Sequence, residues 1–318
     1  MPKRARLLNR TGDKRNRLSK GKYMPKDRST ELARIRQYYA EEIQAVANIR
    51  SPAIVQALAT VPREKFLGPG PWRILSGGLG GFDYRTTEDA DPRHLYHNVL
   101  VAIDSMRKLN NGQPSFLAFC LDALDLAVGD HALHIGCGVG YYTAIMAAAV
   151  GGAGRVTAIE IDSGLAARAR ANLSDLEQIN VIAGDGLYLE RNSANAIFVN
   201  AGATHPLATW LDALKPGGRL ILPLTADESG RGALLKVMRT VEDFGAVFLS
   251  DVAIFPCTGA RDTAIGKLLA EAFRRGARDS VQSLRREPHE SGPTCWLHSE
   301  QFCLSTLGPK IVVNKKLD

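Results

Sequence analysis

Residues 133–141 read Leu-His-Ile-Gly-Cys-Gly-Val-Gly-Tyr and join a predicted strand, His131–Ile135, to a predicted helix, Tyr141–Val150. The glycines of this stretch are Gly136, Gly138 and Gly140. Because they have no Cβ, they let the backbone turn tightly and approach a ligand closely. Tyr141 stands where the G-x-G-x-x-G motif of dinucleotide-binding proteins has its third glycine. The spacing therefore favours a nucleoside that carries an amino acid over one that carries a pyrophosphate.

The sequence around this motif alternates helices with apolar strands from about residue 114 onward. Such alternation indicates an α/β fold, with a mostly parallel, Rossmann-like sheet and helices on both faces. The predicted helices are Pro114–Leu126, Tyr141–Val150, Ser163–Leu176 with Ser163 as N-cap, and a helix capped by Thr204 that runs to Leu214. The predicted strands are His131–Ile135, Val156–Ile161, Val181–Ile182, Ala196–Asn200 and Leu220–Leu224.

The flanking regions follow other patterns. Upstream, helical periodicity covers Ser29–Ala47 and Ala53–Val61, and residues 68–92 are loop-like. Downstream of residue 230, two consecutive strands predict a closing antiparallel hairpin, so the last strand of the sheet is expected to be antiparallel. These downstream segments are the strands Leu234–Val241 and Ala246–Phe255, the helix Ala264–Arg275, and the polar, poorly periodic residues 277–318.

We predict four parts along the 318 residues, of which 45% are hydrophobic. Residues 1–28 form a basic tail, and residues 29–113 form an N-terminal region of helices and loops. Residues 114–258 form the ligand-binding domain, which is large enough to bury its own core. Residues 259–318 form a C-terminal extension.

Positive charge is concentrated in the tail. Residues 1–28 hold eleven Lys or Arg and two acids, a net charge of +9, whereas the whole chain carries +7. The rest of the chain is therefore slightly acidic, and the basic pI describes the tail alone. Three interpretations are open: contact with nucleic acid or another acidic partner, a solvated arm, or a natural start at Met24. We favour the latter two over nucleic-acid binding.

Other bulk features bear on the cellular setting. No run of eighteen apolar residues occurs, which predicts no membrane span, and the first residues lack the apolar stretch of a signal peptide. The five cysteines are scattered, without a Cys-x-x-Cys pair. An odd, scattered set of this kind is typical of reduced thiols, so we expect a cytoplasmic protein.

Further polar residues stand at the carboxyl ends of predicted strands, where ligands of open α/β sheets bind. Glu160, followed by Ile161, closes the strand after the glycine motif, and its carboxylate can accept hydrogen bonds from both hydroxyls of a ribose. Asp185, before Gly186, follows the next strand and can accept a hydrogen bond from an adenine amino group. The segment Lys215–Arg219 predicts a turn into the fifth strand. Each of these features alone is also common in ordinary turns and on protein surfaces. Their occurrence in this order, each at a strand end or turn after the glycine motif, predicts a cofactor site.

Several segments together carry a family resemblance. They are Val61-Pro-Arg-Glu-Lys-Phe66, Gln113-Pro114, His134-Ile-Gly-Cys-Gly-Val-Gly-Tyr141, Gly184-Asp185-Gly186, Ala196-Ile-Phe-Val-Asn-Ala-Gly-Ala203 and Pro256-Cys257-Thr258. With them the chain resembles the protein-L-isoaspartate O-methyltransferase family from about residue 61 to residue 258. The resemblance implies the class I methyltransferase fold and S-adenosylmethionine as cofactor. The residues expected to hold this cofactor are Gly136, Gly138, Gly140, Glu160, Ile161, Asp185 and Gly186.

The resemblance also implies the reaction, which is methyl transfer to a carboxylate of a protein, peptide or small acid. In the family this carboxylate is normally that of an isoaspartyl residue. A carboxylate is already ionised at neutral pH, so the reaction needs no general base. The candidates for contact with the acceptor are Asn111, Gln113, Tyr141 and Thr258.

Two positions depart from the family pattern. Aligned on Gln113, the family's T-I-S segment reads Asn110-Asn111-Gly112 here, so a glycine replaces its serine. His134 stands where the family has an acid that contacts the cofactor. His134 is either a neutral hydrogen-bonding partner of the cofactor or a histidine of the core.

Two alternatives to carboxyl methylation stay open, the first suggested by the basic tail and the shared cofactor motifs and the second by these departures. One is a methyltransferase with an RNA or small-molecule acceptor, although the Asn/Asp-Pro-Pro-Tyr motif associated with base-amino methylation is missing. The other is a non-catalytic module that keeps the fold and the cofactor. The sequence predicts no oligomeric state.

One cluster of metal-ligating residue types lies in the C-terminal extension. It consists of His289, Cys295, His298 and Cys303. Their spacing matches no common zinc finger, so we predict no metal site.

Overall fold

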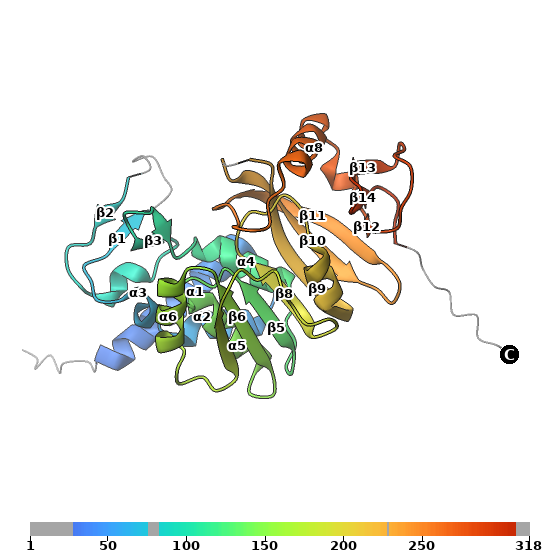
Figure 1. Cartoon of the computed structure of the whole chain (residues 1–318). Coiled ribbons are helices and arrows are strands. Elements are labelled where there is room, and N and C mark those ends of the chain that lie inside the picture. Colours follow the sequence, from blue (N-terminus) through green and yellow to red (C-terminus); the bar gives the residue numbers. More distant parts are fainter. Residues whose placement is uncertain (1–27, 76–82, 228, 310–318) are drawn as a thin grey trace, which may run out of the picture.

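The computed structural model describes residues 28–75, 83–227 and 229–309 (Figure 1). The predicted basic tail lies outside the described residues, apart from Arg28. The N-terminal elements are α1 (Arg28–Ala47), α2 (Pro52–Thr60), α3 (Glu64–Leu67), β1 (Arg73–Leu75), β2 (Arg85–Thr86), the 3-10 helix η1 (Pro92–Leu95), β3 (Leu100–Asp104) and β4 (Leu109–Asn110).

The central elements follow the predicted alternation. They are α4 (Pro114–Ala123), β5 (His131–Ile135), α5 (Tyr141–Val150), β6 (Arg155–Glu160), α6 (Ser163–Asn172), β7 (Ile179–Ala183), β8 (Ala194–Val199), α7 (Ala208–Ala213) and β9 (Leu214–Thr225). The last elements are β10 (Arg231–Arg239), β11 (Phe244–Ala253), α8 (Thr263–Arg275), the 3-10 helix η2 (Arg278–Ser280), β12 (Ser283–Arg285), β13 (Cys295–His298) and β14 (Cys303–Ser305).

A ten-stranded sheet forms the centre of the molecule, in the order β13-β14-β12-β11-β10-β9-β8-β5-β6-β7. The five strands from β5 to β9 pair in parallel, and β10 runs antiparallel to both β9 and β11. This confirms the α/β fold, its parallel core and the antiparallel hairpin, but the strands from β10 to β14 pair antiparallel and make the complete sheet mixed rather than mostly parallel. The chain leaves β5 toward β6 and β7 and then returns to β8 on the other side. The strand order therefore reverses beside β5, which is where such sheets bind ligands.

Helix starts agree with the predictions except at two caps. Ser51 caps α2, since its hydroxyl accepts a hydrogen bond from Ile54 N at 3.4 Å. The predicted cap of α6 was wrong by one residue, because the side chain of Asp162 accepts from Leu165 N at 2.8 Å while Ser163 is the first helical residue. The predicted cap at Thr204 was also wrong. The Thr204 hydroxyl accepts from Asp262 N instead, and α7 begins only at residue 208.

Two further predictions needed correction. Lys215–Arg219 is no separate turn but a part of β9, where Ala194 pairs with Leu214 and Ala196 with Arg219. Between these two pairs β9 has more residues than β8, so the pairing is irregular there, and Gly217 has a φ of +79°. Residues 277–318 are not uniformly irregular, because β12, β13 and β14 lie among them and β12 pairs with β11. The C-terminal extension thus continues the sheet of residues 114–258.

A buried arginine of the N-terminal region contacts both its own region and the sheet domain. Arg63 is fully buried, and its guanidinium donates hydrogen bonds to the carbonyls of Leu95 at 2.6 Å and Val99 at 2.9 Å. It also lies over the ring of Tyr141, with 5.9 Å between Cζ and the ring centroid. A buried cation needs such partners, and here they fix the segment that leads into β3.

In the part of the chain that the structure describes, no helix combines the length and apolarity needed to cross a membrane.

Candidate functional site

A pocket of about 810 Å³ opens at the carboxyl ends of the parallel strands. This volume is within the range of sites for drug-sized ligands. Strands β5, β6, β7 and β8 each contribute residues at or just after their last position, as the strand reversal beside β5 predicts. The hairpin β3–β4 and the start of α4 line the pocket on one side, and residues 251–258 line it on the other.

The glycine loop after β5 forms one wall of the pocket. Gly136 and Gly138 line it with φ angles of +77° and +58°, in the left-handed region that other residues rarely adopt. The side chain of Asn200 holds the loop, because its Nδ2 donates to the Gly136 carbonyl at 3.3 Å. Gly140 does not line the pocket but lies against α6, where a Cβ would approach Leu173 Cδ1 to 2.7 Å. Two of the three predicted glycines thus line the pocket, and the third allows helix packing.

Glu160 lies beneath this loop, at the end of β6. Its side chain is only 6% exposed, yet its residue lines the pocket. Oε2 accepts a hydrogen bond from Gly138 N at 2.7 Å, and Oε1 accepts one from Asp162 N at 3.1 Å. An ionised carboxylate has about four acceptor positions, so these bonds fix its orientation and leave capacity for a ligand's hydroxyls.

Of the other residues predicted to hold the cofactor, two line the pocket and one does not. Ile161 lines the pocket and is 48% exposed, which offers an apolar surface for a flat base. Asp185 also lines the pocket, and its Oδ1 accepts from Leu187 N at 3.0 Å. Gly186 is not on the pocket wall, and its carbonyl accepts from Trp210 Nε1 at 2.9 Å. Gly186 was predicted to hold the cofactor, but its position gives it a structural role. It lets the chain turn with a φ of +68° close to Ile135.

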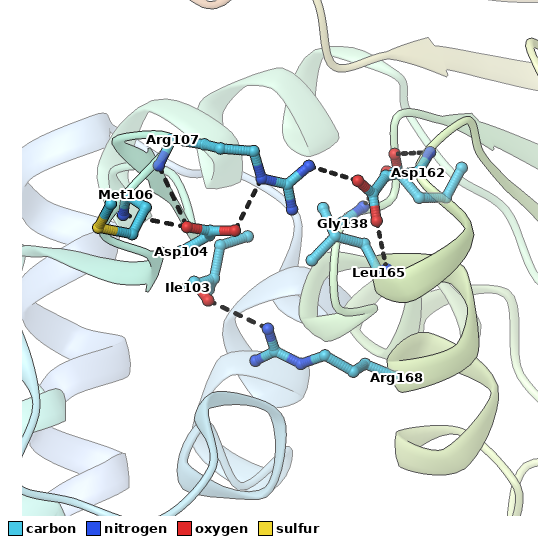
Figure 2. Close-up of polar contacts among 9 residues, drawn as sticks. Ile103, Asp104, Met106, Arg107, Gly138, Asp162, Leu165 and Arg168 are labelled. Carbon is cyan, nitrogen blue, oxygen red and sulfur yellow. Dashed lines mark hydrogen bonds and ion pairs between the residues drawn. The ribbon is translucent and has the colours of Figure 1, made fainter.

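An ion-pair clasp joins the two sides of the pocket (Figure 2). Arg107, on the turn between β3 and β4, pairs through Nε with Asp104 at 2.7 Å and through Nη1 with Asp162. Figure 2 shows the guanidinium lying between these two carboxylates. Arg168, on α6, adds a second link by donating to the Ile103 carbonyl at 3.1 Å.

The clasp alters the charges at the pocket mouth. Arg107 lowers the pKa of Asp104, and hydrogen bonding from Leu165 N and then Arg107 lowers the pKa of Asp162. Both carboxylates therefore stay ionised at neutral pH. Because Asp162 N also donates a hydrogen bond to Glu160, the clasp is connected to the Glu160 carboxylate through one residue.

Of the four residues predicted to contact the acceptor, the structure places Gln113 and Thr258 on the pocket wall. Gln113 precedes α4 without capping it through its side chain, so its amide is available to a ligand. Asn111 is 9% exposed and outside the lining, and its Nδ2 is buried without a hydrogen-bond partner. The prediction for Tyr141 was wrong. This residue is 1% exposed and packs edge-on against Phe66, with ring centroids 5.5 Å apart.

The two departures from the family pattern have structural explanations. Gly112 lines the pocket with a φ of +76°, and a Cβ there would lie 2.9 Å from Leu117 Cδ2. His134 is fully buried, with its Nδ1 2.9 Å from the Thr143 hydroxyl and its ring stacked on Phe198 at 5.3 Å between centroids. Of the two interpretations left open, the core histidine is the one that fits. Burial lowers its pKa to about 3, so the ring is neutral.

Thiols near the site are unsuited to nucleophilic chemistry. Cys257 lines the pocket, and burial raises its pKa. Burial also raises the pKa of Cys137, in the glycine loop, to about 12. Both thiols therefore remain protonated at neutral pH, and only a thiolate is a strong nucleophile.

Sequence reasoning missed both partners of the clasp. Arg107 and Asp162 are 55 positions apart, and neither stands in a motif. Asn200 was quoted only within a predicted strand and a family-like segment and was given no role, although it holds the glycine loop. Arg107 could have been found from the sequence only if the β3–β4 hairpin had been predicted, and its strands are short.

Comparisons with known proteins agree with this geometry. The family model described as Protein-L-isoaspartate(D-aspartate) O-methyltransferase (PCMT) matches residues 89–257. Protein-L-isoaspartate O-methyltransferase 1 of Rhodopseudomonas palustris is 31% identical over 237 residues, which cover 73% of this chain and 86% of that protein. The Protein-L-isoaspartate O-methyltransferase of Trichlorobacter lovleyi is 36% identical over 163 residues, covering 48% of this chain and 73% of that protein.

Solved structures show the same fold. A protein-L-isoaspartate O-methyltransferase aligns with a TM-score of 0.59 and 23% identity, covering 75% of this chain and 69% of that one. A second, from Plasmodium falciparum and in complex with S-adenosyl-L-homocysteine, aligns with a TM-score of 0.54 and 18% identity. That alignment covers 70% of this chain and 98% of the other.

Proposed function

This chain belongs to the protein-L-isoaspartate(D-aspartate) O-methyltransferase family and is an S-adenosylmethionine-dependent methyltransferase, and from this premise we propose that its acceptor is the side-chain carboxylate of an isoaspartyl residue in a protein. The observation that carries the proposal is that Glu160, Gln113 and Thr258 all line one pocket. A cofactor and a carboxylate would therefore share one cavity.

The residues present fit the cofactor. Glu160 keeps free acceptor positions beside Gly136 and Gly138, where no side chain fills the space above the loop. We assign the ribose hydroxyls to Glu160, the base to Ile161 and Asp185, and the amino-acid moiety to the glycine loop. When bound, S-adenosylmethionine supplies the methyl group that a carboxylate oxygen receives.

The chain's own contribution is positional. An acceptor carboxylate is ionised at neutral pH, so no residue has to remove a proton. We assign to the Gln113 amide and the Thr258 hydroxyl the task of holding that carboxylate by hydrogen bonds, in line with the methyl group. Apolar neighbours such as Phe116 and Leu117 line the same wall and exclude water. Correct placement and desolvation together can supply most of the acceleration.

Labelled S-adenosylmethionine and two peptides that differ only in Asp versus isoAsp test the proposal. We expect base-labile label on the isoAsp peptide alone. The variants Gln113→Ala and Thr258→Val should raise KM for the peptide while the affinity for S-adenosylhomocysteine stays unchanged. Label on neither peptide, from a protein that binds S-adenosylhomocysteine, would overturn the proposed acceptor and leave the family assignment intact.

A further inference from the structure

Four side chains of metal-ligating types meet in the C-terminal extension, away from the methyl-transfer pocket. One ligand atom from each of His289, Cys295, His298 and Cys303 lies within 4.8 Å of all the others. None of these residues lines the pocket described above. We propose that they form a structural zinc site.

The measured geometry fits a tetrahedral ion. Zinc binds sulfur at about 2.3 Å and histidine nitrogen at about 2.0–2.1 Å, so two such ligands on a tetrahedron lie about 3.6 Å apart. The distance between His289 Nε2 and Cys295 Sγ is 3.6 Å. The imidazole rings of His289 and His298 meet edge to face, with centroids 4.7 Å apart, which leaves both rings beside the same point.

Surrounding contacts orient the ligands as metal sites require. His289 Nδ1 is 2.8 Å from the Glu287 carbonyl, and donation to that oxygen leaves Nε2 with its lone pair toward Cys295. Gly292 N donates to Cys295 Sγ at 3.4 Å, a contact that stabilises a thiolate. His298 Nδ1 is buried and has no hydrogen-bond partner. An orphaned buried nitrogen in a cluster of ligand types calls for an explanation, and a coordinated ion provides one.

The backbone brings the four residues together from three segments. His298 and Cys303 are directly opposite each other on β13 and β14, and Cys295 begins β13. His289 comes from residues 286–294, which form no helix or strand between β12 and β13. An ion here would join this irregular segment to both strands. Strands of three or four residues have little stability of their own, so such a link would hold the end of the sheet in place.

The chemistry of the ligand set selects the ion. Two thiolates and two imidazoles in a tetrahedron suit zinc, whereas calcium and magnesium require oxygen ligands. With four protein ligands the coordination is complete, so the site has no position for a substrate and its role is structural. The proposal departs from the prediction of no metal site. That prediction relied on linear spacing, whereas the cluster depends on the register of β13 and β14.

Metal analysis of the full chain, purified under reducing conditions from zinc-supplemented medium, tests the site. We expect about one zinc per chain in the wild type. His289→Ala and Cys295→Ser should lose most of it, while the control His97→Ala, which removes an exposed histidine elsewhere, should retain it. Full zinc content in both ligand variants would overturn the proposal.

Cobalt provides a readout that needs no variant to fold. Reduced wild-type protein, stripped of metal and supplied with Co²⁺, should show the visible bands of tetrahedral cobalt and a thiolate charge-transfer band. Chelation should lower the melting temperature while the Kd for S-adenosylhomocysteine stays within about twofold. Reduced protein that neither retains zinc nor gives these bands would refute the site.

Discussion

Glu160 and Gly138 are joined by a hydrogen bond of 2.7 Å, in which the carboxylate at the end of β6 accepts from the backbone of the loop that follows β5. The acid that is assigned to the ribose therefore also holds the glycine loop. We therefore expect cofactor binding and the geometry of the glycine loop to depend on the same side chain.

Replacement of this acid should weaken cofactor binding. We expect Glu160→Ala to raise the Kd for S-adenosylhomocysteine about 5- to 150-fold, since lost charge-assisted hydrogen bonds cost about 1–3 kcal/mol. Isothermal titration calorimetry measures this, with Glu177→Ala as the control for loss of an exposed acid. An unchanged Kd in Glu160→Ala would remove Glu160 from the cofactor site.

The clasp between Arg107 and Asp162 should slow the release of the cofactor product. In Arg107→Met, S-adenosylhomocysteine should dissociate faster at low salt. The wild-type rate should approach that of the variant as salt rises, because exposed ion pairs are screened. Asp162→Asn should behave similarly, since asparagine retains the N-cap of α6 but not the charge. Stopped-flow measurements over a salt series would show equal, salt-independent rates if the clasp has no role.

Restoring a serine at position 112 should destabilise the protein rather than improve catalysis. In Gly112→Ser, the left-handed φ of +76° and the approach of Cβ to Leu117 should together lower the free energy of unfolding by about 1–3 kcal/mol. Urea unfolding measures the loss. The matched control is Gly152→Ser, because no atom lies within 4 Å of a Cβ at that exposed glycine. A fully stable Gly112→Ser variant with higher activity would contradict this account.

Acid should destabilise the protein through His134. Its pKa is lowered to about 3 in the folded state by burial, while the unfolded chain binds a proton near pH 6.5. The unfolded state therefore binds more protons between these values, so stability falls as the pH drops from about 6.5 toward 3. This residue alone contributes a slope of up to about 1.4 kcal/mol per pH unit.

The variant His134→Asn should lack this part of the acid sensitivity, whereas His97→Asn, at an exposed position, should keep it. Unfolding free energies between pH 4 and pH 8 distinguish the two. Parallel pH profiles for the wild type and His134→Asn would contradict a neutral, buried ring.

Sequence patterns predicted the centre of the fold because the information there is local. The glycine loop, Glu160 and Asp185 each lie within a few residues of an apolar strand, and the parallel sheet then brings them to one side. The same patterns could not separate Gly136 from Gly140, because which glycine faces the ligand depends on the packing of α6 against the loop.

Features that depend on distant contacts escaped prediction. Tyr141 was a candidate because it follows the motif, but α5 is buried on nearly every side, so its position in sequence did not indicate exposure to the pocket. The strands after residue 280 are short and polar at many positions, which hid both the continuation of the sheet and the register that brings His298 opposite Cys303.

The pairing of β12 with β11 determines how far an expressed chain can be shortened from its C-terminal end. The match to the family ends at residue 257, and a clone trimmed there would lack β12, β14 and β13. Phe244 and Gly245 would lose the backbone partners that Leu284 and Ser283 provide, and the buried apolar cluster that includes Phe244 would lose Leu269 of α8. An open, unpaired strand with apolar neighbours recruits strands from other molecules. Soluble expression therefore requires the chain through β14, well beyond the boundary that family similarity suggests.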